Sequence, residues 1–101
     1  MIKVHVESKN QINTIKILGH ADYDEYGKDI VCSSVSSIVT TTVNGIYEIN
    51  KDFLNIEVIK DGMIITINNN DTVCMKLIKN MLTLLSELEE SYPENIKVIN
   101  K

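Results

Sequence analysis

The chain has 101 residues, of which 44% are hydrophobic and 24% are charged, as expected for one globular domain. Its 14 acidic residues outnumber its 10 basic ones, which gives a net charge of −4 at pH 7. Every basic residue is a lysine, and the lysines form no stripe, so direct nucleic-acid binding is disfavoured. No apolar run reaches the roughly 18 residues of a membrane span, and we expect no membrane partner.

The first ten residues alternate polar and apolar side chains, with Ile2, Val4 and Val6 on one side. This period predicts a half-exposed strand and not a signal peptide. Without an export signal, we expect a cytoplasmic protein whose two cysteines are thiols and form no disulfide. A polar turn at Lys9–Gln11 leads to a second strand that ends in Ile15, Ile17 and Leu18, and the two strands predict a hairpin.

From Asp29 onward the apolar residues follow a helical period. The residues expected on the buried face are Val31, Val35, Ile38, Val39, Val43, Ile46 and Tyr47. Asp61-Gly62 lies between two apolar runs and predicts a second hairpin. Thr72–Ser91 predicts another amphipathic helix, which ends before Pro93, and a short strand follows from Ile96. The order β-β-α-β-β-α-β predicts an α+β fold, a single domain over residues 1–101 with two helices on a mostly antiparallel sheet.

The two predicted helices begin with similar sequences, Asp-Ile-Val-Cys at residues 29–32 and Asp-Thr-Val-Cys at residues 71–74. Each aspartate is a good N-cap, so a helix start alone does not distinguish Cys32 from Cys74. Small serines follow Cys32, whereas large side chains follow Cys74, and no histidine precedes Cys74 nearby. We therefore expect Cys74 to be a small buried side chain.

Cys32 has the features of an activated thiol. The positive end of a helix dipole favours the thiolate, and His20 precedes it by twelve positions, after a strand whose loop must return to that helix start. A nearby imidazole could accept the thiol proton, and backbone N–H groups of the first turn could hold an oxyanion. Ser36 lies one turn later on the same face and could donate a hydrogen bond near the sulfur.

Two other kinds of site fit the same stretch less well. A calcium loop starting at Asp22 matches at Asp24 and Gly27, but Tyr26 and Ser33 stand where two decisive ligands belong. A structural zinc site needs four ligands, and only His20 and Cys32 are available, so we expect no metal. A phosphatase-like thiolate needs an arginine for phosphate, and the chain has none.

The spacing of several motifs resembles that of the ribosomal-processing cysteine proteases, the Prp family. The matching residues are Gly19-His20-Ala21, Tyr26-Gly27, Asp29-Ile30-Val31-Cys32 and Ser36, followed by Val43-Asn44 and Tyr92-Pro93-Glu94-Asn95-Ile96. The resemblance extends over the whole chain and is densest at residues 19–36. Ser33 and Ser34 depart from the family, which often has alanine or glycine there, and Tyr23-Asp24 makes the loop bulkier.

By this resemblance, Cys32 would be the nucleophile and His20 the general base, with Gly19, Asp29 and Ser36 as supporting residues. The loop containing Ala21, Asp22, Asp24, Glu25 and Gly27 would be a flap over the substrate. The implied protein is a homodimeric cysteine endopeptidase without cofactor that removes a short N-terminal extension from large-subunit ribosomal protein number twenty-seven, a basic partner. Two rivals remain open, a non-catalytic ribosome-associated binding module of the same fold and a small-ligand regulatory domain.

Overall fold

A computed structural model of the chain describes residues 1–20, 23–25 and 29–100. The elements are β1 (Ile2–Lys9), β2 (Gln11–Leu18), α1 (Ile30–Ile49), β3 (Leu54–Ile59), β4 (Gly62–Ile67), α2 (Thr72–Ser91) and β5 (Ile96–Asn100). This order confirms the predicted α+β succession of strands and helices.

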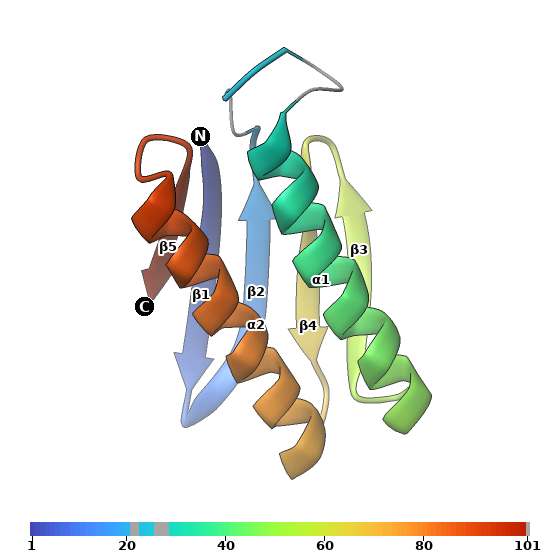
Figure 1. Cartoon of the computed structure of the whole chain (residues 1–101). Helices are drawn as coiled ribbons and strands as arrows, with labels where there is room; N and C mark the ends of the chain where they lie inside the picture. The colour runs from blue at the N-terminus through green and yellow to red at the C-terminus, as the bar shows by residue number, and fades with distance from the viewer. Residues whose placement is uncertain (21–22, 26–28, 101) are drawn as a thin grey trace.

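The strands form one sheet in the order β3-β4-β2-β1-β5. The pairings β1–β2, β2–β4 and β3–β4 are antiparallel, and β5 adds to β1 in parallel, so the sheet is mostly antiparallel as predicted. Both helices lie side by side on the same face of the sheet (Figure 1). This order places β4 beside β2, although β3 and the whole of α1 separate them in the sequence.

The core lies between the helices and one face of the sheet. Alternation along the strands directs the apolar residues to this face, where Val4 pairs with Ile17 and Ile15 pairs with Ile65 across neighbouring strands. Buried positions on α2, such as Ile78 and Leu85, close the core from the other side. Each fully buried aliphatic side chain of this kind stabilises the fold by about 1.5–3 kcal/mol relative to an exposed one.

The apolar row of α1 is buried over most of its length but not at its end. Val31, Val35, Val39 and Val43 are buried, whereas Tyr47 is 41% exposed. Its predicted place on the buried face is therefore wrong. With about 3.6 residues per turn, a row of residues spaced four apart drifts steadily around a helix, so the fifth member leaves the face. Ile46, one position earlier, is buried in its place.

By length and composition alone, α1 is the one helix among the described residues that could span a membrane. The core helix of a globular protein passes the same test. Here the apolar stripe of α1 is part of the buried core, and serines and threonines occupy much of its remaining surface. The absence of a membrane partner stays a prediction.

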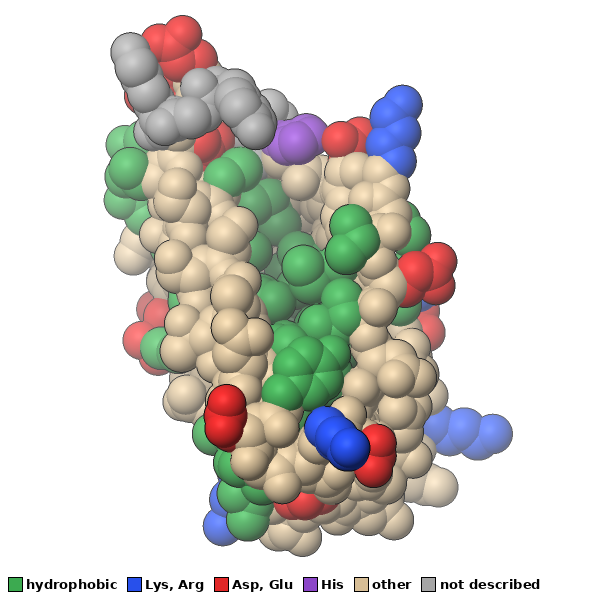
Figure 2. All heavy atoms as spheres, turned by 90° about the vertical axis from the view of Figure 1, so that its right-hand side faces the viewer, with side chains coloured by type: hydrophobic (Ala, Val, Ile, Leu, Met, Phe, Trp, Pro, Cys, Tyr) green, Lys and Arg blue, Asp and Glu red, His purple; other side chains and the backbone are tan. Residues whose placement is uncertain are grey.

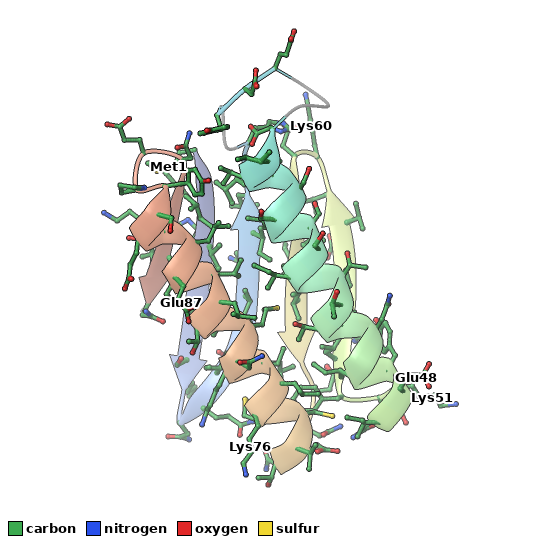
Figure 3. All side chains as sticks on the ribbon, in the orientation of Figure 1. Met1, Glu48, Lys51, Lys60, Lys76 and Glu87 are labelled. Atoms are coloured by element: carbon green, nitrogen blue, oxygen red, sulfur yellow. The ribbon has the colours of Figure 1, made fainter. Side chains whose placement is uncertain are left out.

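Three elements meet at one end of the molecule. The end of β2, the turn between β3 and β4 and the first turn of α1 all lie at the top of Figure 1. In Figure 3, Lys60 of that turn lies at the same end of the molecule as the start of α1, whereas Glu48 and Lys51 mark the opposite end of the helix. Residues from distant parts of the sequence therefore converge here.

Candidate active site

A cavity of about 950 Å³ opens between α1 and the sheet at this end. Its apolar lining comes from both layers, and the same side of the molecule shows a hollow with hydrophobic side chains along its floor (Figure 2). The lining residues are Ile2, Ile17, Gly19, His20, Asp24, Asp29, Cys32, Ser33, Val35, Ser36, Ser37, Val39, Asp61, Gly62 and Met63. The cavity thus brings together both members of the predicted dyad and all three predicted supporting residues.

Cys32 lies in the first turn of α1 and is partly buried. Asp29 caps the helix as predicted, since its Oδ1 accepts hydrogen bonds of 3.0 Å from the backbone N–H groups of Val31 and Cys32. The backbone carbonyl of Asp29 accepts the N–H and the hydroxyl of Ser33. The cap therefore fixes the backbone that carries the thiol.

Asp29 also accepts a bond that the sequence did not predict. Its Oδ2 accepts the backbone N–H of Tyr23 at 3.0 Å, so one buried carboxylate joins the loop to the helix start. Burial by itself would raise the pKa of Asp29, but backbone hydrogen bonds, from Cys32 and Tyr23 foremost, outweigh it and hold the pKa below its ordinary value. Asp29 is thus an anion at neutral pH at the start of the helix that carries Cys32.

The hydrogen bonds that cap α1 correct the expectation that first-turn amides hold the oxyanion. The sequence suggested that first-turn amides would hold an oxyanion, yet the N–H groups of Val31 and Cys32 already donate to Asp29 and that of Ser33 donates within the helix. These three amides are not available in this conformation. An oxyanion would need another donor, and the hydroxyl of Ser36 is an exposed group in the same cavity.

His20 follows β2 directly after Gly19, whose conformation requires glycine. Gly19 has φ +92°, and a Cβ there would lie 2.5 Å from the carbonyl oxygen of Met1. The backbone turns sharply at this point and leads into His20, whose Nε2 lies 3.0 Å from Oδ1 of Asp61. Both side chains are more than half exposed.

Asp61 is the site residue that sequence reasoning missed. Asp61-Gly62 predicted the hairpin between β3 and β4, and this hairpin is confirmed with Lys60 and Asp61 as its turn. Its aspartate had no assigned role, because a hairpin signal does not say which strand the hairpin lies beside. Pairing of β4 with β2 brings Asp61 to His20 across 41 positions of sequence.

The two cysteines differ as the sequence suggested. Neither forms a disulfide, and whereas Cys32 lines the cavity, Cys74 is fully buried in the core. Burial raises the pKa of the Cys74 thiol, and the charge of Asp71 and its hydrogen bond to that thiol raise it further. Cys74 therefore stays a protonated side chain of the core.

The predicted flap is described only in part. Asp24 lines the cavity, and its carboxylate accepts the backbone N–H of Glu25 at 2.7 Å. Ala21, Asp22 and Gly27 lie outside the described residues. Within residues 1–20, 23–25 and 29–100, no three histidine, cysteine or acidic side chains gather as metal ligands.

Comparison with known proteins identifies a family that this chain matches over nearly its whole length. The family model described as "Cysteine protease Prp" matches residues 1–97. The ribosomal processing cysteine protease Prp of Staphylococcus aureus is 29% identical over 100 residues, which cover 96% of this chain and 94% of that protein.

Solved structures agree with the family match. The crystal structure of S. aureus Prp with a covalently linked product peptide superimposes with a TM-score of 0.94 at 29% identity, with each chain fully covered. The structure of S. aureus Prp with a substrate peptide gives a TM-score of 0.87 at 28% identity, again over both full chains. The fold and the family together define a cysteine protease. The chain belongs to the cysteine protease Prp family.

Proposed function

We propose that this protein processes a ribosomal protein by removing the short N-terminal extension of large-subunit ribosomal protein number twenty-seven, through a Cys32–His20 dyad. The observation that carries the proposal is the shared cavity: Cys32 in the first turn of α1 and His20, two residues after β2, line one hollow. Relatives named for ribosomal processing, and a relative solved with substrate and product peptides, support a peptide as the substrate.

In the proposed mechanism, the imidazole of His20 accepts the thiol proton and the thiolate of Cys32 attacks the scissile carbonyl. The tetrahedral intermediate collapses to a thioester as the amine leaves with the proton from His20. Water, deprotonated by His20, then attacks the thioester, and the acid product leaves as the thiol is restored. No cofactor takes part in these steps.

The chemistry of the cavity fits a peptide. Its floor includes the apolar side chains of Ile17, Val35 and Met63, which can hold a bulky apolar side chain. The serines after Cys32 are small, so a substrate backbone can approach the thiol closely. Asp24 at the rim suits a partner that carries positive charge, as a ribosomal protein does.

The test is to incubate the purified protein with the extended ribosomal protein and to read the product masses. Cys32→Ala and His20→Ala should abolish cleavage with the fold retained, whereas Cys74→Ala should keep substantial activity because its thiol lies in the core. Turnover by Cys32→Ala would end the dyad hypothesis. Binding of the extended protein without any cleavage by the parent would favour the non-catalytic module instead.

We also propose that the protein is a cytoplasmic homodimer, as the family resemblance implies. Sedimentation equilibrium of the purified chain, whose mass is 11.4 kDa, measures the assembly directly. A single species at the mass of one chain over micromolar concentrations would contradict the dimer. Fractionation of cells tests the compartment.

A further inference from the structure

Two hydrogen bonds join the turn between β3 and β4 to the segment that carries His20. The backbone N–H of Gly19 donates to the carbonyl oxygen of Asp61 at 2.8 Å, and the ring of His20 bonds through Nε2 to the carboxylate of the same residue at 3.0 Å. One residue therefore holds both the backbone before the histidine and the imidazole itself. The first bond involves only backbone atoms and holds the turn against the segment that carries His20, whereas the second depends on the Asp61 side chain.

The position of Asp61 follows from the sheet and not from a flexible side chain. Asp61 has φ +60°, an uncommon conformation for a residue other than glycine. The next residue, Gly62, pairs with Leu18 at the end of β2, and a Cβ on Gly62 would lie 2.3 Å from the carbonyl oxygen of Ile17. Because only glycine permits this approach, the turn packs directly against the end of β2, two residues before His20.

We propose that Asp61 is a positioning residue for the protease reaction, which orients His20 so that Nε2 carries the proton and Nδ1 faces the thiol of Cys32. The inference rests on the proposed dyad. A carboxylate only accepts hydrogen bonds, so the nitrogen that it contacts is the one that bears hydrogen in the neutral imidazole. The lone pair then lies on Nδ1. Once Nδ1 has taken the thiol proton, the nearby carboxylate also stabilises the imidazolium.

The alternative is that His20 and Asp61 form an ordinary surface ion pair. Their side chains are 60% and 56% exposed, and exposed pairs contribute little to folding stability. The two readings therefore differ in what removal of the carboxylate changes. If the two residues form only a surface ion pair, removing the carboxylate should change kcat, KM and the melting temperature little. If Asp61 positions His20, kcat should fall in a protein that is still stably folded.

The decisive variant is Asp61→Gly, since glycine adopts the positive φ readily and removes the carboxylate. Its matched control is Asn10→Gly, because Asn10 has φ +71° in the turn between β1 and β2, at the other end of the sheet. Asp61→Asn keeps an oxygen acceptor in the turn without the charge, and asparagine also tolerates positive φ. For all three, the measurements are kcat and KM on the extended ribosomal protein, the melting temperature and the alkylation rate of Cys32.

We expect Asp61→Gly to lower kcat by about tenfold to a hundredfold, part of the roughly 10²–10⁴ that general acid–base catalysis supplies, with KM and melting temperature near those of Asn10→Gly. Alkylation of Cys32 should slow in parallel, which a purely structural role would not cause. Asp61→Asn should lie between the parent and Asp61→Gly. An Asp61→Gly protein that turns over within about twofold of Asn10→Gly overturns the proposal, given that an orienting carboxylate should contribute more.

Should Asp61→Gly be unstable, the single-turnover rate of Asp61→Asn decides, and a rate equal to that of the parent overturns the proposal. Cys32→Ala and His20→Ala are assayed beside these variants. Cleavage by either would refute the dyad itself, whatever Asp61 does. If both are inactive and Asp61→Gly cleaves like the parent, only the role of Asp61 is refuted.

Discussion

The carboxylate of Asp29 accepts the backbone N–H of Cys32 through one oxygen and that of Tyr23 through the other, each at 3.0 Å. The residue that caps α1 is thus also the residue that ties the preceding loop to the helix. Asp71, the cap of α2, instead bonds to the N–H of Cys74 and to the side chain of Asn50, away from the cavity. The two caps form a natural pair for separating helix capping from a role in the site.

Asp29→Ala should destabilise the protein by about 0.5–2 kcal/mol, the usual effect of losing an N-cap. Asp29→Asn should keep most of that stability, since asparagine is an equally good cap, yet it replaces one of the two acceptor oxygens with a donor group. We therefore expect Asp29→Asn to lose activity while its chemical denaturation midpoint holds. Asp71→Asn, assayed in the same way, should keep its activity. Equal loss in both variants would mean that capping alone matters.

Stability should fall in acid partly because of Asp29. Its pKa is lowered in the folded protein, so the charged form contributes stability above the ordinary value of 3.8, and this is lost as pH falls through the lower folded value. The pKa of Asp71 is lowered too, first by the hydrogen bond from the backbone N–H of Cys74. Protonation of Asp71 in acid should therefore also lower the stability of the fold. Urea unfolding between about pH 5 and pH 3 should show a shallower decline for Asp29→Asn than for the parent. An identical slope would show that Asp29 is not an acid-sensitive cap.

The two cysteines should differ in reactivity. Cys32 lines the cavity, whereas Cys74 is fully buried with a raised pKa, so iodoacetamide should modify Cys32 first by a large margin. Peptide mass mapping after short exposure measures the two sites in one sample. In His20→Ala the modification of Cys32 should slow, because the imidazole no longer accepts the thiol proton. Equal labelling of the two thiols in the folded protein would contradict an activated dyad.

The acidic loop should attract a basic substrate at low ionic strength. Asp24 and Glu25 are exposed, and Asp24 lines the cavity, so replacing Asp22, Asp24 and Glu25 by their amides should weaken substrate capture. The loss in kcat/KM should shrink as salt rises, because exposed charges are screened beyond about 8–10 Å at physiological ionic strength. Cleavage rates against substrate concentration at two ionic strengths measure this. The same loss at both would indicate direct contact with the substrate instead of long-range attraction.

A change in the loop backbone gives the complementary test. The residue Gly27 is the glycine of the predicted flap, and Gly27→Val should lower turnover at every ionic strength, because a β-branched residue resists positive backbone angles. The charged residues stay in place, so a salt-dependent loss in this variant would be unexpected. Cleavage like that of the parent would show that the loop does not gate the reaction.

The sequence by itself determined the local structure. Alternation in the strands, the helical row from Val31 and the caps at Asp29 and Asp71 predicted the elements, because each depends on residues a few positions apart. Motif spacing singled out Cys32 and His20. Only the tertiary structure decided that β4 pairs with β2, which brings Asp61 to His20, and that Asp29 reaches back to Tyr23. These contacts depend on the order of strands in the sheet and on the path of a loop, which local periodicity does not encode.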